Sequence, residues 1–184
     1  MAPDIHDTHW KRLSRSILVD TRFLKVYNDR VQMPTGHVID DYSVVSMPSG
    51  VVIVATDQQD RLITQFEYKY AINKTILNLP SGSVEGDEPV LEVAARELLE
   101  ETGYIADDLV LVQTVYEYPS KADHVIHIVR ANGAYRARDV QHEATETIGP
   151  VHLITADMKD YGGVFDTTYN ITALALTLPA YLKQ

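Results

Sequence analysis

The order in which strand-like and helix-like patterns follow one another constrains the fold of this chain more than any other feature. Short apolar stretches separated by polar, proline- and glycine-containing turns come first, and residues 51–55, Val-Val-Ile-Val-Ala, are typical of a central strand buried on both faces. Residues 89–102 repeat their apolar side chains at helical spacing, and Gly103 can end that helix in a left-handed conformation. Further strand-like segments precede a second helical stretch at about residues 168–182. This order predicts an α/β fold, in which a mixed sheet carries helices on its faces.

Composition excludes several classes of protein. The chain has 26 acidic and 16 basic residues and a formal net charge of −10, which disfavours binding to nucleic acid or to an anionic membrane. It has no cysteine, so disulfides, thiolate nucleophiles and cysteine-ligated metals are excluded. We find no apolar run long enough to span a membrane and no signal-peptide pattern, and therefore expect a cytoplasmic protein. An acidic protein with a phosphate substrate would need a divalent metal to offset the repulsion.

Three glutamates crowd one face of the first predicted helix. Glu97 and Glu101 are four residues apart and Glu100 is three from Glu97, so the three side chains are neighbours on the helix surface. Arg96 is the one basic residue within residues 82–104. Such a group of hard oxygen ligands is typical of Mg²⁺ or Mn²⁺ sites. An acidic run taken alone is more often a solvated helix face, so the surrounding pattern has to decide between the two interpretations.

Residues 82–104, GSVEGDEPVLEVAARELLEETGY, resemble the Nudix box Gly-x5-Glu-x7-Arg-Glu-U-x-Glu-Glu-x-Gly-U, where U is a bulky aliphatic residue. The one departure is Tyr104 at the last U position, where we expect altered packing and unchanged chemistry. The resemblance implies a Nudix-type α/β/α sandwich around a mixed β-sheet, here with a β-rich N-terminal segment, and a hydrolase of nucleoside diphosphates linked to another group. The matching positions are Gly82, Glu88, Arg96, Glu97, Leu98, Glu100, Glu101 and Gly103.

The resemblance also assigns roles within the box. Arg96 would orient a glutamate through a charge-assisted hydrogen bond, Glu88 would join that network, and Gly82 and Gly103 would shape the backbone. The metal would neutralise the pyrophosphate and lower the pKa of a bound water for attack on phosphorus. The ligands implied for Mg²⁺ or Mn²⁺ are Glu97, Glu100, Glu101 and the backbone carbonyl of Ser81.

The base that activates this water is expected on a loop after the box. Glu143 and Glu146 are both candidates, because the acidic run typical of the family is thinner in this chain. We favour Glu143; otherwise Glu146 or a box glutamate such as Glu100 would take the role.

Features outside the box resemble the branch of ADP-ribose pyrophosphatases and nucleoside-diphosphate-sugar hydrolases. In that branch a β-rich segment such as residues 1–44 builds a homodimer and contributes to the partner's substrate pocket, and residues 45–184 would then form the Nudix hydrolase domain. Lys69 stands where the branch has a phosphate-contacting arginine. Pro119 lies fifteen residues past the box, a spacing associated with ADP-ribose specificity.

Each expected substrate contact has an ordinary structural alternative. Lys69 is equally a solvated lysine on a strand, and Pro119 is equally a turn proline. Phe23 and Tyr27 could stack on a base, although aromatic rings in strands more often belong to a core. Residues 77–82, Leu-Asn-Leu-Pro-Ser-Gly, are similar to the family's Glu-Leu-Pro-Ala-Gly but depart from it in their asparagine and serine.

The sequence therefore predicts a Mg²⁺-dependent, homodimeric enzyme that splits ADP-ribose or a nucleoside diphosphate sugar into a nucleoside monophosphate and a sugar phosphate. One alternative is a Nudix hydrolase acting on an oxidised nucleoside triphosphate or a dinucleoside polyphosphate, although the long N-terminal segment disfavours the triphosphate. Another is a non-catalytic nucleotide-binding module, which the complete set of box glutamates disfavours.

Overall fold

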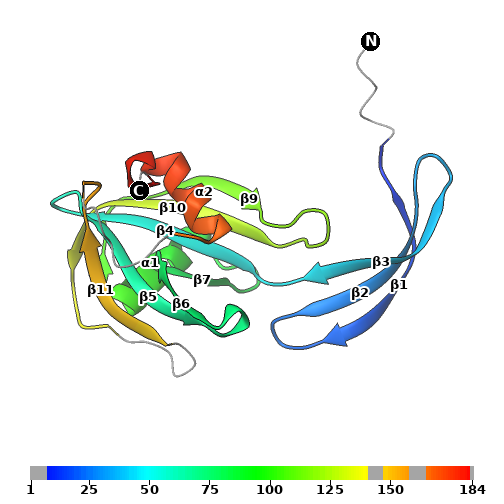
Figure 1. Cartoon of the computed structure of the whole chain (residues 1–184), viewed down its shortest axis with the longest axis horizontal. Helices are drawn as coiled ribbons and strands as arrows, with labels where there is room; N and C mark the ends of the chain where they lie inside the picture. The colour runs from blue at the N-terminus through cyan, green and yellow to red at the C-terminus, as the bar shows by residue number, and fades with distance from the viewer. Residues whose placement is uncertain (1–7, 141–146, 158–164, 183–184) are drawn as a thin grey trace, which may run out of the picture. The chain divides into compact units, whose positions relative to one another are not determined.

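The computed structural model describes residues 8–140, 147–157 and 165–182. Its contacts divide the chain into two compact units. The N-terminal unit consists of residues up to 48 together with 118–124, and the second unit holds the remainder of the chain. Figure 1 labels the strands and helices of both.

The N-terminal unit is built on a three-stranded antiparallel sheet in the order β1-β2-β3. The turn between β2 and β3 needs Gly36, whose φ of 86° lies in the left-handed region that favours glycine. Asp29 and Val31 are the only described residues of this unit that are fully buried. The sheet therefore has almost no hydrophobic core of its own. Its strands are β1 (Lys11–Asp20), β2 (Lys25–Gln32) and β3 (Val38–Ser46).

Residues 118–124 lie along the edge of β3. The backbone N–H of Val45 donates to the carbonyl of Lys121 at 2.7 Å, and the Tyr42 hydroxyl donates to the carbonyl of Ser120 at 2.7 Å. The ammonium of Lys121 sits 3.9 Å from the centre of the Tyr42 ring. This loop is thus held to the N-terminal sheet by backbone pairing, a hydroxyl and a cation–π contact.

The second unit contains an eight-stranded mixed sheet. Its central path runs β11-β5-β4-β10-β8, while β6 pairs with β5, β7 with β4 and β9 with β10. The β4–β10 pair is parallel and the other pairs are antiparallel. The elements are β4 (Ser49–Asp57), β5 (Leu62–Lys69), η2 (Tyr70–Ile72), β6 (Lys74–Asn78), β7 (Ser81–Val84), α1 (Val90–Thr102), β8 (Tyr104–Ile105), β9 (Leu109–Tyr116), β10 (Val125–Arg136), β11 (Ile148–Ile154), α2 (Thr168–Thr177) and η3 (Pro179–Leu182).

Strand β4 separates two hydrophobic clusters, as the apolar run predicted. Because successive side chains of a strand point to opposite faces, Val52 and Val54 join the cluster that contains α2. Val51, Ile53 and Ala55 join the cluster that contains α1. Figure 1 shows α2 and α1 against the strands of the sheet. The predicted α/β fold, with helices on both faces of a mixed sheet, is confirmed.

The predicted helices are present, with one correction. Helix α1 begins directly after Pro89 and ends at Gly103, whose φ is 76°. The second helix was predicted to reach residue 182, but α2 ends at Thr177 and a short 3₁₀ turn follows. Pro179 explains the break, because proline has no N–H to donate and its ring collides with the preceding turn. Among the described residues, no helix is both long enough and apolar enough to cross a membrane.

Candidate active site

Gly82 brings a carboxylate against the backbone of β7. This strand pairs with β4, so that Gly82 lies opposite Val51, and the Pro80 carbonyl accepts the N–H of Ile53 at 2.8 Å. A Cβ atom at Gly82 would overlap the carboxyl group of Glu97. Glycine therefore permits this close approach, because an added side chain would displace the carboxyl end of this glutamate of α1.

Gly103 fixes the other end of the helix. Its N–H donates to the Leu99 carbonyl at 2.9 Å, and its own carbonyl accepts the N–H of Ala137 at 2.8 Å. A Cβ atom here would overlap the carbonyl oxygen of Arg138. Gly103 thus ends α1 and docks it against residues 137–138, immediately before the segment that carries the candidate bases.

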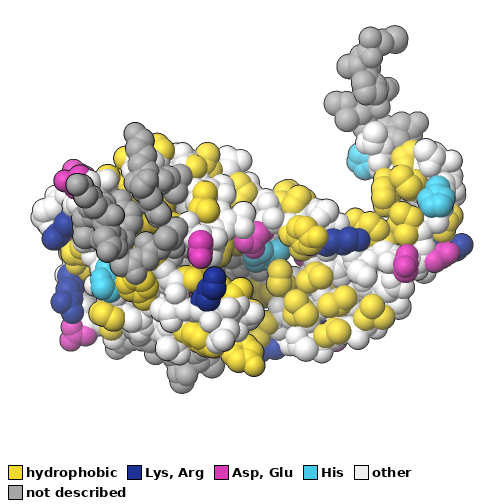
Figure 2. Space-filling model, in the orientation of Figure 1, with side chains coloured by type: hydrophobic (Ala, Val, Ile, Leu, Met, Phe, Trp, Pro, Cys, Tyr) yellow, Lys and Arg dark blue, Asp and Glu magenta, His cyan; other side chains and the backbone are white. Residues whose placement is uncertain are grey.

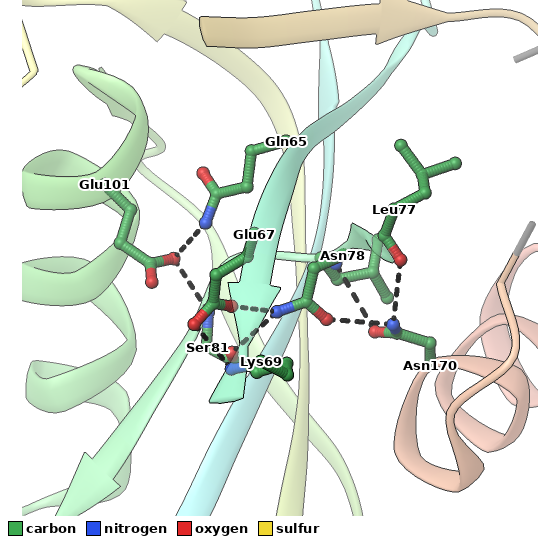
Figure 3. Close-up of polar contacts among 9 residues, drawn as sticks. Gln65, Glu67, Lys69, Leu77, Asn78, Ser81, Glu101 and Asn170 are labelled. Carbon is green, nitrogen blue, oxygen red and sulfur yellow. Dashed lines mark hydrogen bonds and ion pairs between the residues drawn. The ribbon is translucent and has the colours of Figure 1, made fainter. Parts of the chain in front are cut away.

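Glu101 is the most deeply buried acid of the site. Glu101 is only 3% exposed. Its Oε2 accepts the Gln65 amide N–H at 2.8 Å and the Ser81 backbone N–H at 2.9 Å. Figure 3 shows these contacts between α1, β5 and β7. Burial raises the pKa of Glu101 well above its usual value, and the carboxylates of Glu67 and Glu97 raise it further. The two hydrogen bonds lower this pKa but do not outweigh burial.

Arg96 holds the other two box glutamates. Its Nη1 lies 2.8 Å from Oε1 of Glu97 and 3.4 Å from Oε2 of Glu100. The predicted orienting contact of Arg96 is therefore present in the geometry. Glu88 accepts the backbone N–H of Glu85 at 3.2 Å and so closes the turn before α1.

Strand β5 contributes polar side chains to the same place. Gln65 donates to Glu101, and two residues further Glu67 pairs with Lys69 at 2.6 Å. The Asn78 amide donates to the second Glu67 oxygen at 2.7 Å. Lys69 therefore reaches the site paired with a carboxylate, and its predicted contact with phosphate stays a prediction.

Helix α2 extends this set of contacts. The amide N–H of Asn170 donates to Oδ1 of Asn78 at 2.9 Å and to the carbonyl of Leu77 at 3.4 Å, while its oxygen accepts the N–H of Leu79 at 3.3 Å. Figure 3 shows how these contacts lead from α2 to β5. Asn170 and Asn78 are fully buried, and their hydrogen bonds offset the cost of burying amides.

The remaining predicted site residues belong to the N-terminal unit or to a segment outside the described residues. Phe23, Tyr27 and Pro119 belong to the N-terminal unit, and one face of the Tyr27 ring is covered by the Arg15 guanidinium, 4.1 Å from the ring centre. Pro119 lies in the loop that pairs with β3. Glu143 and Glu146 fall outside the described residues. The substrate and base roles of these five residues stay predictions.

The carboxylates suit a divalent cation by their chemistry. The carboxylates of Glu67 and Glu97 both raise the pKa of the buried Glu101, and all three side chains offer hard oxygen atoms. Within the described parts of the chain, no three acidic or histidine side chains converge as a formed metal site, since the carboxylates turn toward Arg96, Gln65 and backbone N–H groups. A cation that drew Glu97, Glu100 and Glu101 together would relieve their mutual repulsion.

Comparison with known proteins identifies the family. Residues 10–45 match the nucleoside diphosphate sugar hydrolase N-terminal domain, and residues 47–158, more than half of the chain, match the NUDIX domain. The chain belongs to the Nudix family. The predicted family is thereby confirmed.

Relatives of this Nudix protein include several hydrolases. It is 27% identical over 121 residues to an ADP-ribose pyrophosphatase of Bacillus subtilis, covering 66% of this chain and 65% of that protein. It is 29% identical over 127 residues to the ADP compounds hydrolase NudE of Escherichia coli, covering 68% of each. It is also 28% identical over 123 residues to a methanol dehydrogenase activator of Bacillus methanolicus, covering 67% and 66%. The chain thus spans slightly less than two thirds of the Bacillus relatives.

A solved structure extends the likeness to nearly the whole Nudix chain. A crystal structure of an ADP compounds hydrolase superposes with a TM-score of 0.74 and 25% identity, over 91% of each chain. The likeness in fold therefore covers about nine tenths of the chain.

Sequence reasoning missed four residues of this Nudix site. Gln65 and Glu67 could have been found, because with Lys69 they place polar side chains at every second position of an otherwise apolar strand. Asn78 was noticed only as a departure from the family pattern. Asn170 gave no signal, because it meets Asn78 across 92 positions of sequence.

Proposed function

We propose that this Nudix protein is a Mg²⁺-dependent pyrophosphohydrolase of ADP-ribose or another nucleoside diphosphate derivative, such as a nucleoside diphosphate sugar. The products would be a nucleoside monophosphate and a sugar phosphate. The observation that carries the proposal is the burial of Glu101 between β5 and β7, beside Glu97. The names of the ADP-ribose and ADP-compound hydrolase relatives support the choice of substrate class.

Residues of the Nudix box would hold the metal. Glu97, Glu100, Glu101 and the Ser81 carbonyl are the proposed ligands, with Mg²⁺ or Mn²⁺ as the ion. When bound, the ion supplies positive charge for the diphosphate and lowers the pKa of water. Arg96 holds two of these carboxylates at a fixed spacing, which limits the rearrangement needed for ligation.

The box glutamates can be tested with one isosteric change. Glu101→Gln removes a ligand charge and preserves the side-chain volume, so we expect kcat at saturating Mg²⁺ to fall by at least about 100-fold. Glu92→Gln on the exposed side of α1 is the matched control and should keep the wild-type rate. Wild-type turnover by the Glu101 variant would refute the metal assignment.

Product analysis tests the reaction itself. We expect purified protein with Mg²⁺ to release a nucleoside monophosphate from ADP-ribose or from one member of a panel of nucleoside diphosphate derivatives. Hydrolysis in ¹⁸O-labelled water would show which phosphorus is attacked. Failure to cleave any pyrophosphate in the panel would refute the proposed activity.

The general base is proposed to be Glu143. Glu143→Gln should then lower kcat with little change in KM, because proton abstraction belongs to the chemical step. A normal kcat would move the role to Glu146 or to a box glutamate such as Glu100.

We further propose that the N-terminal unit forms the interface of a homodimer. Its described residues bury almost no core, while β1 exposes Ile17 by 56% and Leu18 by 61%. Figure 2 shows hydrophobic side chains gathered on the three-stranded sheet. A second copy would cover such a surface, and Phe23 and Tyr27 could then serve the partner's pocket. Deletion of residues 1–44 should abolish dimerisation and activity, and a fully active monomer would contradict this idea.

Lys69 and Pro119 complete the proposed substrate contacts. Lys69 would contact a phosphate, and Pro119 would contact ADP-ribose and favour it as the substrate. The cytoplasm is the proposed location. The charge of −10 makes nucleic acid and anionic membranes poor partners.

A further inference from the structure

Glu67 is a carboxylate of the site that lies outside the Nudix box. It comes from β5, and its side chain is only 12% exposed. Asn78 joins it to the box, because one amide nitrogen lies 2.7 Å from the Glu67 carboxylate and 3.5 Å from the Ser81 hydroxyl. The backbone N–H of Ser81 in turn donates to Glu101. Figure 3 shows the contacts that lead from Glu67 through Asn78 and Ser81 to Glu101.

The orientation of Glu67 is set by three structural elements. Asn78 of β6 binds one oxygen, Lys69 of β5 binds the other, and Asn170 of α2 holds Asn78. Each carboxylate oxygen has two lone pairs, so one hydrogen bond on each leaves acceptor capacity on both oxygens. Glu67 is therefore a fixed carboxylate that can still accept from a metal-bound water or bind a cation.

Gln65 gives a second, independent indication of a ligand at this place. It is fully buried, it contacts Glu101 through its N–H, and its Oε1 has no hydrogen-bond partner among the described residues. A buried amide oxygen without a donor is costly. Water carried into the site on a hydrated cation would supply that donor, since Mg²⁺ keeps several of its waters when bound to proteins.

We propose that Glu67 is an additional carboxylate of the divalent-cation site, contributed by the sheet and oriented by Asn78. It is linked to the buried Glu101 through Asn78 and Ser81, and it adds negative charge beside the box glutamates. Lys69, paired with the same carboxylate, places a cation for the substrate beside the metal site. The inference rests on the proposed function, because it assumes that the box binds a divalent cation.

Binding of Mn²⁺ to the nucleotide-free full chain tests the inference without any turnover. Titration followed by electron paramagnetic resonance measures the fraction of Mn²⁺ bound. Glu67→Gln keeps the size of the side chain and can keep one of its two hydrogen bonds, but it removes the charge. We expect its Mn²⁺ affinity to fall at least about tenfold, as is typical for partners of metal sites. Glu92→Gln, which removes the same charge from the exposed side of α1, should match the wild type.

The Lys69→Met variant separates the effect of removing the Glu67 charge from the effect of breaking its ion pair with Lys69. It also breaks the Glu67–Lys69 pair, but it removes a positive charge, so Mn²⁺ affinity should stay equal to the wild type or increase. Wild-type affinity in Glu67→Gln, or an equal loss in both variants, would overturn the inference. If the wild type hydrolyses its substrate and the variants give one of these two results, only the role of Glu67 is refuted. If the wild type neither binds Mn²⁺ nor hydrolyses any substrate, the proposed function is refuted as well.

Discussion

Replacing Glu101 with glutamine should stabilise the metal-free protein while it abolishes activity. The two hydrogen bonds to Glu101 share one oxygen, Oε2, which accepts from both Gln65 and Ser81. A glutamine at this position can present its amide oxygen to both donors, so the substitution preserves both bonds. What it removes is a buried charge close to the carboxylates of Glu67 and Glu97.

The size of this effect follows from two opposing contributions. The effective cost of burying an ionised carboxylate is several kcal/mol. Hydrogen bonds to a charged acceptor are stronger than neutral ones by about 1 kcal/mol each, so two of them return about 2 kcal/mol. We expect a net stabilisation of about 2 kcal/mol at neutral pH, which for a chain of this length raises the Tm by about 4–8 °C.

The pH dependence supplies a second readout with a definite sign. Because burial raises the folded-state pKa of Glu101 above the unfolded value, its contribution to stability is present at low pH and is lost as pH rises through the folded-state pKa. Glutamine does not titrate. The stability advantage of Glu101→Gln should therefore grow from pH 5 to pH 7.5.

Thermal unfolding in EDTA and in Mg²⁺ completes the test. Mg²⁺ at 100 times its Kd adds about 2.7 kcal/mol to a protein that binds it, so wild type should gain stability with Mg²⁺ while Glu101→Gln does not. A Glu101 variant that melts below the wild type in EDTA at pH 7.5 would show that the buried charge is compensated within the fold, and the reasoning would fail.

Two further changes test the packing. Gly82→Ala should weaken Mn²⁺ binding at little cost in stability, because its Cβ would displace the carboxyl end of the Glu97 side chain. Gly133→Ala is the control: its Cβ meets open space and only its φ of 64° is strained, so Mn²⁺ affinity should stay unchanged in the same titration. Asp29→Ala should destabilise the N-terminal unit by about 1–2 kcal/mol, because Arg15 loses the carboxylate that it binds through two contacts of 2.7 Å but is itself exposed to water; urea unfolding that matches the wild type would contradict this.

The sequence predicted those parts of the molecule that local pattern determines. The apolar run of β4 identified a strand between two hydrophobic layers, and Pro89 and Gly103 marked the ends of α1. The contact of Arg96 with a glutamate was implied by the resemblance to the Nudix box; helical spacing accounts for its contact with Glu100 at i,i+4 but not for the one with Glu97. The end of α2 was missed, although Pro179 was visible as a breaker within the predicted helix.

Contacts between distant segments could not be predicted in the same way. Asn78 and Asn170 each look like ordinary polar residues, and only the tertiary fold brings them together in a buried place. The same is true of the loop at Pro119, whose pairing with β3 joins segments separated by more than 70 residues. A single sequence gives no record of such pairing, because neither partner alters the local pattern of the other.

The burial of Glu67 points to a role in cation binding that its position in the sequence does not suggest. In an exposed strand, a glutamate two residues from a lysine forms a weak surface pair, and nothing about its chemistry follows. Here the Glu67 side chain is only 12% exposed, although Lys69 is 35% exposed, and one oxygen of Glu67 is fixed by an amide that Asn170 of α2 holds in turn. Lys69 offsets part of the cost of this negative charge, but the Glu67 carboxylate still raises the pKa of the buried Glu101. A fold that invests three elements in orienting that charge is expected to offset the cost with a bound cation, and the Mn²⁺ affinity of Glu67→Gln measures that contribution directly.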